Sequence, residues 1–124
     1  MKLLDTSVII GLLRGEEKAE EIIENEDETL CTCSPIQCEL YRGTKLARKT
    51  EEGEKEVEAL INQLENLEAT KESAKKVAEL QEKYPEINTF DLMIAAISLS
   101  HQASLITKDK DFQKIEELET KIIK

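Results

Sequence analysis

Short strand-like segments alternate with helical segments along this chain, and this alternation limits its fold more than any other feature. The strand-like segments lie at 2–5, 29–33, 104–107 and 120–123, with a short edge strand at 67–70. Strands that alternate with helices form parallel sheets with right-handed crossovers. We therefore expect an α/β fold, a three-layer α/β/α sandwich around a short parallel sheet.

Helical periodicity fills the intervals between these strands. In the segment 51–66, Val57, Leu60 and Leu64 recur at helical spacing, while glutamates occupy the remaining faces. Ser34 followed by Pro35 is typical of an N-cap and a first helical residue. The helices are expected at 6–14, 16–27, 34–49, 51–66, 71–84 and 89–102, with a turn or short helix at 108–118.

The composition excludes several classes of function. The 124 residues suit one domain over 1–124, and no segment reaches the roughly 18 apolar residues of a membrane span, so we expect a cytoplasmic protein. The formal net charge of −10 disfavours nucleic-acid binding through a broad basic patch and favours a basic partner. Cys31, Cys33 and Cys38 lack a fourth metal ligand nearby, so we expect small buried thiols rather than disulfides or a zinc site.

An acidic residue stands alone in the most apolar helical segment. Asp91 is the only charged residue of the stretch "TFDLMIAAISLS", which is apolar on nearly every side and should pack in the interior. We expect Thr89 to be the N-cap, which places Asp91 in the first turn, where free N–H groups and the helix dipole favour an anion. Helix capping alone explains this residue as well as a functional role does.

Four further acidic residues, in three segments, stand where a site is expected. Asp5 follows the first strand, Glu39 lies at the edge of the apolar stripe of its helix, and Asp109 and Asp111 follow the strand 104–107. Ligands of parallel α/β sheets bind outside the carboxyl ends of the strands. Together with Asp91, these acids could share one cleft. Clustered carboxylates repel one another unless cations neutralise them, and hard oxygen ligands favour Mg²⁺ or Mn²⁺.

The same segments resemble a known family. "LLDTSVIIGLL", "SPIQCELYRG", "FDLMIAAIS" and "LITKDKDF" occur in the order and at the intervals of the PIN-domain ribonucleases, and among these the chain is similar to the VapC toxins of prokaryotic toxin–antitoxin pairs. The resemblance implies an α/β/α sandwich with strand order 3-2-1-4-5. It also implies a carboxylate quartet that binds Mg²⁺ or Mn²⁺, and a homodimer.

The resemblance also assigns residues. The positions that match the metal-binding and catalytic quartet are Asp5, Glu39, Asp91 and Asp109. Two hydroxyl residues, Thr6 and Thr107, match positions that support such a site, and Asp111 is an alternative or auxiliary acid.

The activity implied is that of a metal-dependent endoribonuclease. Metal-activated water would cleave RNA phosphodiester bonds, and a small antitoxin with a basic segment would inhibit the protein. The chain has a single histidine, His101, which we expect at the polar end of the apolar helix rather than beside the acids, and this argues against histidine acid–base catalysis.

Two other classes of protein are compatible with parts of the pattern. A phosphoacceptor receiver-like domain also places acids around Mg²⁺, but it needs a mid-chain strand that ends in an acceptor Asp. The segment 51–66 is helical instead, and no Asp occurs between Asp27 and Asp91. A non-catalytic interaction module, whose acids are helix caps and solvated faces, is the other alternative.

Overall fold

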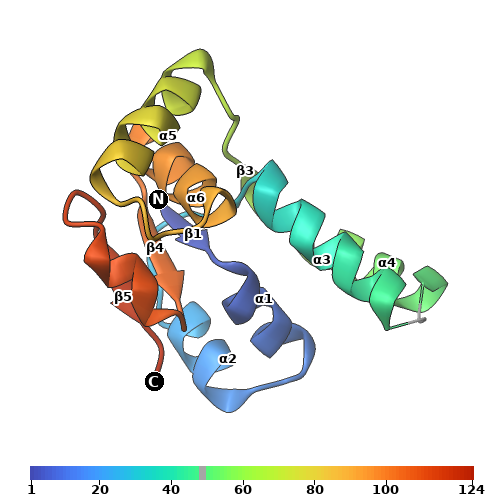
Figure 1. The fold of residues 1–124 in the computed structure, drawn as a ribbon. Helices are drawn as coiled ribbons and strands as arrows, with labels where there is room; N and C mark the ends of the chain where they lie inside the picture. Colours follow the sequence, from blue (N-terminus) through green and yellow to red (C-terminus); the bar gives the residue numbers. More distant parts are fainter. Residues whose placement is uncertain (48–49) are drawn as a thin grey trace.

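A five-stranded parallel sheet forms the centre of the protein. The computed structural model describes residues 1–47 and 50–124. The strand order is β3-β2-β1-β4-β5, and every neighbouring pair is parallel (Figure 1). The predicted fold class and strand order are therefore confirmed. The strands are β1 (Lys2–Leu4), β2 (Leu30–Thr32), β3 (Glu65–Asn66), β4 (Ser104–Thr107) and β5 (Thr120–Ile122).

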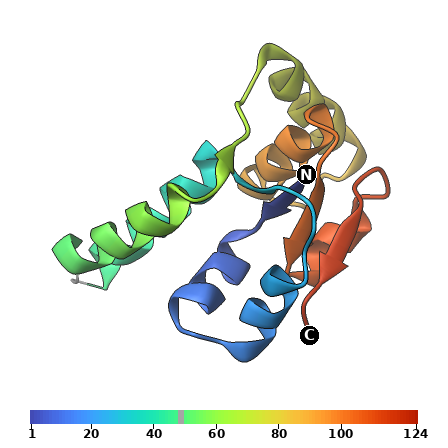
Figure 2. The same cartoon turned by 180° about the vertical axis from the view of Figure 1, so that it is seen from behind.

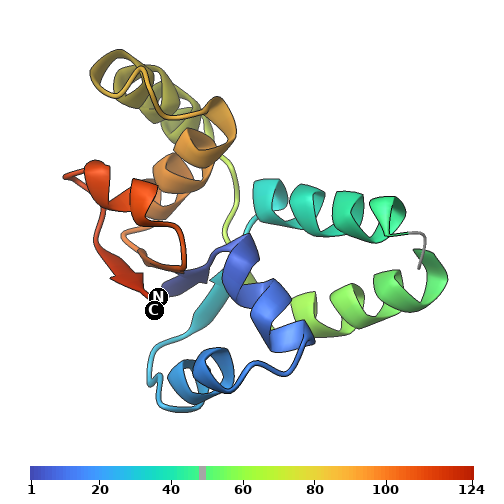
Figure 3. The same cartoon turned by 60° about the horizontal axis from the view of Figure 1, so that its bottom comes forward.

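Helices cover both faces of the sheet. Right-handed crossovers place the helices that lead from β1 through β2 to β3 on one face, and the helices that return to β4 on the other. Figure 3 shows α1 and α2 on one side of the strands and α5 and α6 on the other, while Figure 2 shows the pair α3 and α4 extending away from the sheet. The helices are α1 (Thr6–Leu13), α2 (Glu17–Glu24), α3 (Ser34–Leu46), α4 (Thr50–Ile61), α5 (Lys71–Lys83), α6 (Thr89–Ser100) and the 3₁₀ helix η1 (Lys110–Lys114).

The core lies around the two central strands and α6. Leu3 and Leu4 of β1 and Leu105 and Ile106 of β4 are fully buried. Buried residues run from position 92 to position 98 of α6 with one interruption, which confirms that this helix packs in the interior. Among the described residues, no helix combines the length and the apolar character that crossing a membrane requires.

Several boundaries differ from the sequence-based predictions. Helix α4 ends at Ile61 rather than at Asn66, because residues 65–66 pair with β2 and form the edge strand predicted at 67–70. Strand pairing outweighs the helical periodicity here. Helix α3 ends at Leu46, and positions 48–49 of the predicted helix lie outside the described residues.

The predicted N-caps are wrong by one residue. Helix α3 begins at Ser34, so that Cys33 is its N-cap, and α6 begins at Thr89, so that Asn88 is its N-cap. Asn88 accepts a hydrogen bond from the Asp91 N–H through its side chain, which explains why this residue, rather than Thr89, ends the extended segment.

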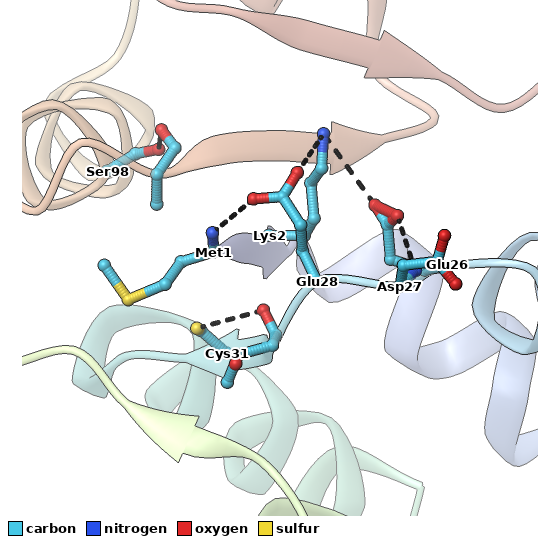
Figure 4. A network of polar contacts seen from close by, with 9 residues as sticks. Met1, Lys2, Glu26, Asp27, Glu28, Cys31 and Ser98 are labelled. Carbon is cyan, nitrogen blue, oxygen red and sulfur yellow. Dashed lines mark hydrogen bonds and ion pairs between the residues drawn. The ribbon is translucent and has the colours of Figure 1, made fainter.

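Ion pairs stabilise the end of the sheet at which the parallel strands begin. The α-amino group of Met1 lies 2.7 Å from Glu28 Oε1, and Lys2 Nζ lies 3.4 Å from Glu28 Oε2 and 3.7 Å from Glu26 Oε1 (Figure 4). These contacts hold the start of β1 against the loop that leads into β2. They lie at the opposite end of β1 from Asp5 and leave the carboxyl end of the sheet open for a site.

Candidate functional site

Four acidic side chains come together at the carboxyl end of the sheet. Asp5 follows β1, Asp109 follows the adjacent strand β4, and Asp91 lies in the first turn of α6. Helix α3 contacts both α1 and α6 and brings Glu39 to the same place. Burial is the largest cause of the raised pKa of Asp5 and of Asp91; the charges of Glu39 and Asp109 add to it at Asp5, and the charges of the other three acids add to it at Asp91. Positions far apart in sequence are therefore electrostatic neighbours.

Asp5 is buried but does not cap the helix that follows it. Its backbone occupies the N-cap position of α1, yet its side chain makes no capping hydrogen bond. The carboxylate instead accepts a hydrogen bond of 2.6 Å from the Thr107 hydroxyl. Burial raises the pKa of Asp5, and the Thr107 hydrogen bond partly offsets this effect. A capping role through the side chain is thus excluded for Asp5.

Thr107 joins two of the acids. Its buried hydroxyl donates to Asp5 and accepts a 3.0 Å hydrogen bond from the Asp109 N–H. The Asp109 carboxylate in turn accepts from the Asp111 N–H and caps η1. The Asp111 carboxylate is exposed and lies 3.2 Å from Lys114 Nζ. The structure thus brings Thr107 and Asp109 into the cluster and turns the Asp111 side chain toward solvent.

The second predicted hydroxyl contacts a different acid. Thr6, the first residue of α1, donates a 2.7 Å hydrogen bond to Glu39 Oε1. Both side chains are half-buried. Thr6 and Thr107 therefore each hold one carboxylate of the cluster in place.

Asp91 carries the clearest sign of electrostatic strain. Burial, followed by the charges of the neighbouring acids, raises its pKa from 3.8 to about 6. The Asn88 side-chain amide donates a 2.9 Å hydrogen bond to Asp91 Oδ2, which lowers that pKa in part. The sequence analysis did not single out Asn88, although an Asn three residues before an Asp at a helix start is a recognisable signal.

Three further contacts near the cluster have no signal in the sequence pattern. Ser7 Oγ accepts a hydrogen bond from the Lys108 N–H and lies 3.5 Å from Asp5 Oδ2. The Lys108 ammonium group pairs with Glu16. The Ser7 contact ties the start of α1, and the Glu16 contact the start of α2, to the chain that leaves β4, about a hundred residues away in sequence.

The carboxylate oxygens of this cluster are the type of ligand that a hard divalent cation prefers. Burial and the charges of neighbouring acids raise the pKa of Asp5 and of Asp91, a bound cation would favour their ionised form, and carboxylate oxygens favour Mg²⁺ or Mn²⁺. Burial raises the pKa of the neighbouring Cys33 thiol to about 12, so it stays protonated and offers no soft ligand. Within residues 1–47 and 50–124, no three Asp, Glu, His or Cys side chains stand close enough to hold one ion. A shared ion therefore requires the side chains to move closer together.

Comparison with known proteins identifies the family. The PIN domain model matches residues 2–118, and the chain therefore belongs to the PIN-domain family. This result confirms the resemblance found in the sequence. No curated protein sequence matches the chain.

Solved structures with the same fold come from toxin–antitoxin complexes. A chain of VapBC-5 from Mycobacterium tuberculosis is 27% identical, with a TM-score of 0.69 and coverage of 99% of this chain and 97% of that one. A chain of VapBC2 from Rickettsia felis, bound to a promoter DNA fragment, is 20% identical, with a TM-score of 0.89 and coverage of 98% and 97%. A chain of DNA-bound VapBC from Salmonella typhimurium is 24% identical, with a TM-score of 0.87 and coverage of 99% and 98%.

The receiver-like alternative is wrong. Receiver domains of the flavodoxin-like type have the strand order 2-1-3-4-5. This protein has β3 at the edge, next to β2, and β1 in the centre. Within the part of the chain that the structure describes, the mid-chain strand is β3, and its residues Glu65 and Asn66 supply no acceptor Asp.

Proposed function

We propose that this PIN-domain protein is a metal-dependent endoribonuclease and the toxin of a toxin–antitoxin pair that acts in the cytoplasm. The observation that carries the proposal is the convergence of Asp5, Glu39, Asp91 and Asp109 at the carboxyl end of the sheet. Among the described residues, no Lys, Arg or His forms an ion pair with any of these four acids. Burying several carboxylates close together lowers the stability of the fold unless a bound cation neutralises their charge.

The roles proposed for the residues follow from their contacts. Asp5, Glu39, Asp91 and Asp109 would hold Mg²⁺ or Mn²⁺, and the two threonine hydroxyls would orient the carboxylates that they contact. A divalent cation, when bound, supplies positive charge opposite the phosphate and activates water for attack on phosphorus. His101 caps the end of α6, and its ring nitrogen lies 2.8 Å from the Glu68 carbonyl oxygen. It is thus engaged away from the acids, which supports attack by water rather than histidine catalysis.

A substitution at Asp91 tests the nuclease proposal. Asp91→Asn keeps the shape of the side chain and an oxygen for the Asn88 amide, but it removes the charge that a cation would bind. We expect the wild type to cleave a mixed RNA pool only with Mg²⁺ or Mn²⁺, and the variant to fold and lose cleavage. Asp111→Asn, at the exposed neighbouring acid, is the matched control and should remain active. Gel analysis of the RNA and sequencing of its cleaved ends provide the measurements.

Two results would contradict the nuclease proposal. Cleavage by Asp91→Asn at the wild-type rate would show that the carboxylate cluster takes no part in the reaction. A wild type that binds neither metal nor RNA would favour the non-catalytic interaction module.

The proposed partner is a small antitoxin with a basic segment. The matching folds come from VapBC complexes, and the net charge of −10 favours a basic partner that could place an arginine against the carboxylates. We also propose a homodimer. Co-expression with the product of the neighbouring gene should yield a tight complex without ribonuclease activity, and light scattering should give twice the chain mass for the toxin alone. A neighbour that neither binds nor inhibits would contradict the toxin role and leave the nuclease proposal intact.

A further inference from the structure

A groove opens beside the carboxylate cluster where α3 meets the start of α6. Its volume is about 310 Å³, and it is lined by Cys38, Glu39, Arg42 and Phe90. Glu39 belongs to both the groove and the cluster. A ligand that occupies the groove would therefore extend directly into the candidate site.

Phe90 presents an aromatic ring that the core does not use. It precedes Asp91 in the first turn of α6, a helix whose other large apolar side chains are mostly buried. Phe90 is 38% exposed, and Leu46 is the other large apolar side chain classed as exposed in the described part of the chain. Leu46 does not line this groove. What distinguishes Phe90 is its place: its ring borders a groove that also contains Glu39, so a ligand that enters the groove can contact the ring.

Arg42 adds a positive charge to the same groove. It lies one helical turn after Glu39, is exposed, and forms no ion pair with a described residue. The chain as a whole carries a net charge of −10, so the Arg42 guanidinium brings a positive charge to a groove that borders an acidic cluster. A planar cation and an aromatic face thus line one groove that ends at a carboxylate.

We propose that this groove binds one nucleotide of single-stranded RNA next to the bond that is cleaved. The base stacks on Phe90, and the Arg42 guanidinium contacts a backbone phosphate. The inference rests on the proposed nuclease function and extends it from the chemistry to the positioning of the substrate.

These two contacts would allow RNA to bind although the acidic surface repels its phosphates. Proteins bind unpaired RNA by stacking splayed bases on aromatic rings, a contact that does not depend on net charge. A bidentate arginine holds a phosphate without a broad basic patch. Because stacking is tolerant of sequence, the groove fixes the strand beside the cluster more than it selects a base.

The chain offers a direct probe of stacking, because it contains no tryptophan. Phe90→Trp therefore places a single indole in the groove, and Leu46→Trp places one at the matched exposed position outside it. Each variant is titrated with a ten-nucleotide RNA in Ca²⁺, with gels to verify that the RNA stays intact. We expect quenching of the Phe90→Trp fluorescence, no response of Leu46→Trp, and a weaker response to an oligonucleotide without bases. A Phe90→Trp signal that intact RNA leaves unchanged would overturn the inference.

The wild-type protein supplies a second test through its thiols. Contrary to the sequence-based expectation, Cys38 is exposed, whereas Cys31 and Cys33 are buried. Bound RNA should protect Cys38 from alkylation by iodoacetamide. Equal labelling with and without saturating RNA would contradict occupation of the groove.

Affinity measurements separate the two contacts. Phe90→Ala should weaken RNA binding by about 5-fold to 100-fold. Arg42→Gln should weaken it and reduce the slope of affinity against salt by about one. Circular dichroism verifies that both variants fold.

Failure of the groove and failure of the nuclease proposal give different results. If the wild type cleaves RNA while Phe90→Ala and Arg42→Gln bind and cleave it equally well, the groove assignment is wrong and the nuclease proposal stands. If the substitutions disturb only the dimer or the antitoxin complex, the groove is a protein contact and the inference is overturned. If the wild type neither binds nor cleaves RNA, both fail.

Discussion

At the scale of single residues, the cluster contains carboxylates whose ionised form is disfavoured. Asp91 is half-buried, and its pKa rises from 3.8 to about 6 through burial and the charges of Asp5, Asp109 and Glu39. Above pH 6 the side chain is ionised in both the folded and unfolded states, so the folded state bears the full cost of the charge. Below pH 3.8 it is protonated in both states, and the cost vanishes. The stability contributed by this position therefore rises as the pH falls from about 6 to about 3.8.

This sign predicts an unusual stabilising substitution. At pH 7.5 and without metal, Asp91→Asn should raise the free energy of unfolding by about 0.5–2 kcal/mol, a range that allows for solvent screening at a half-exposed position. At pH 4 the gain should disappear. Urea unfolding at both pH values measures the difference, and Asp111→Asn is the control because that carboxylate is exposed and paired with Lys114. A loss of stability at pH 7.5 would show that Asp91 serves its helix as a capping-turn anion.

At the scale of secondary-structure elements, helix starts determine where functional and structural side chains lie. Helix α5 begins with a capping box in which the Thr70 hydroxyl accepts from the Ser73 N–H at 3.1 Å and Ser73 Oγ accepts from the Thr70 N–H at 2.7 Å. Asn88 is the N-cap of helix α6, and its side chain accepts from the Asp91 N–H and donates to the Asp91 carboxylate. One helix start only stabilises the fold, whereas the other also holds an acid of the candidate site.

The α5 cap gives a prediction that separates stability from activity. Thr70→Ala removes an acceptor for the first turn of α5 and should lower the free energy of unfolding by about 1 kcal/mol. RNA cleavage below the unfolding temperature should stay at the wild-type rate. Thr70→Ser keeps the hydroxyl and should cost much less. Thermal melts and cleavage assays on the same preparations measure both effects, and a parallel loss of activity in Thr70→Ala would mean that α5 takes part in the site.

Local patterns were sufficient to predict the order of the elements but not their ends. The apolar helix α6 and the strand β4 show clear local periodicity, and both were predicted within two residues. Glu65 and Asn66 have no strand-like pattern, and they form β3 because β2 lies beside them. The N-cap of α6 is Asn88 rather than the predicted Thr89. Either residue type can cap a helix, so tertiary packing decides between them.

The same limit applies to the candidate site. The sequence showed Asp5 and Asp109 at strand ends, Asp91 at a helix start and Glu39 at the edge of a helical apolar stripe. The hydrogen bond from Thr107 to Asp5 joins residues 102 apart, and the groove of Arg42 and Phe90 joins two helices distant in sequence. Such contacts depend on the packing of α3 against α6, which no local pattern encodes. Resemblance to a family supplied Thr107 but gave no indication of Asn88, Arg42 or Phe90.

At the scale of the whole molecule, the excess of negative charge makes any cation stabilising to some degree. With a net charge of −10, the acidic side chains repel one another and also repel the phosphates of RNA. Salt of any kind screens both repulsions. A specific metal site must therefore be distinguished from general screening. The distinction depends on whether stabilisation by a divalent ion requires the four clustered acids or only the total charge.

Binding linkage supplies the decisive prediction for the whole protein. At a free Mn²⁺ concentration a hundred times its dissociation constant, the wild type should gain about 2.7 kcal/mol of stability. Asp5→Asn and Asp91→Asn lose one donor each and should gain much less, whereas Asp111→Asn loses the same charge outside the cluster and should respond like the wild type. Melting curves with Mn²⁺, and with NaCl at matched ionic strength, measure the specific part, and calorimetric titration gives the dissociation constant. Equal shifts of all four proteins, reproduced by NaCl, would show that the ion only screens the acidic surface, and the proposed metal site would have to be abandoned.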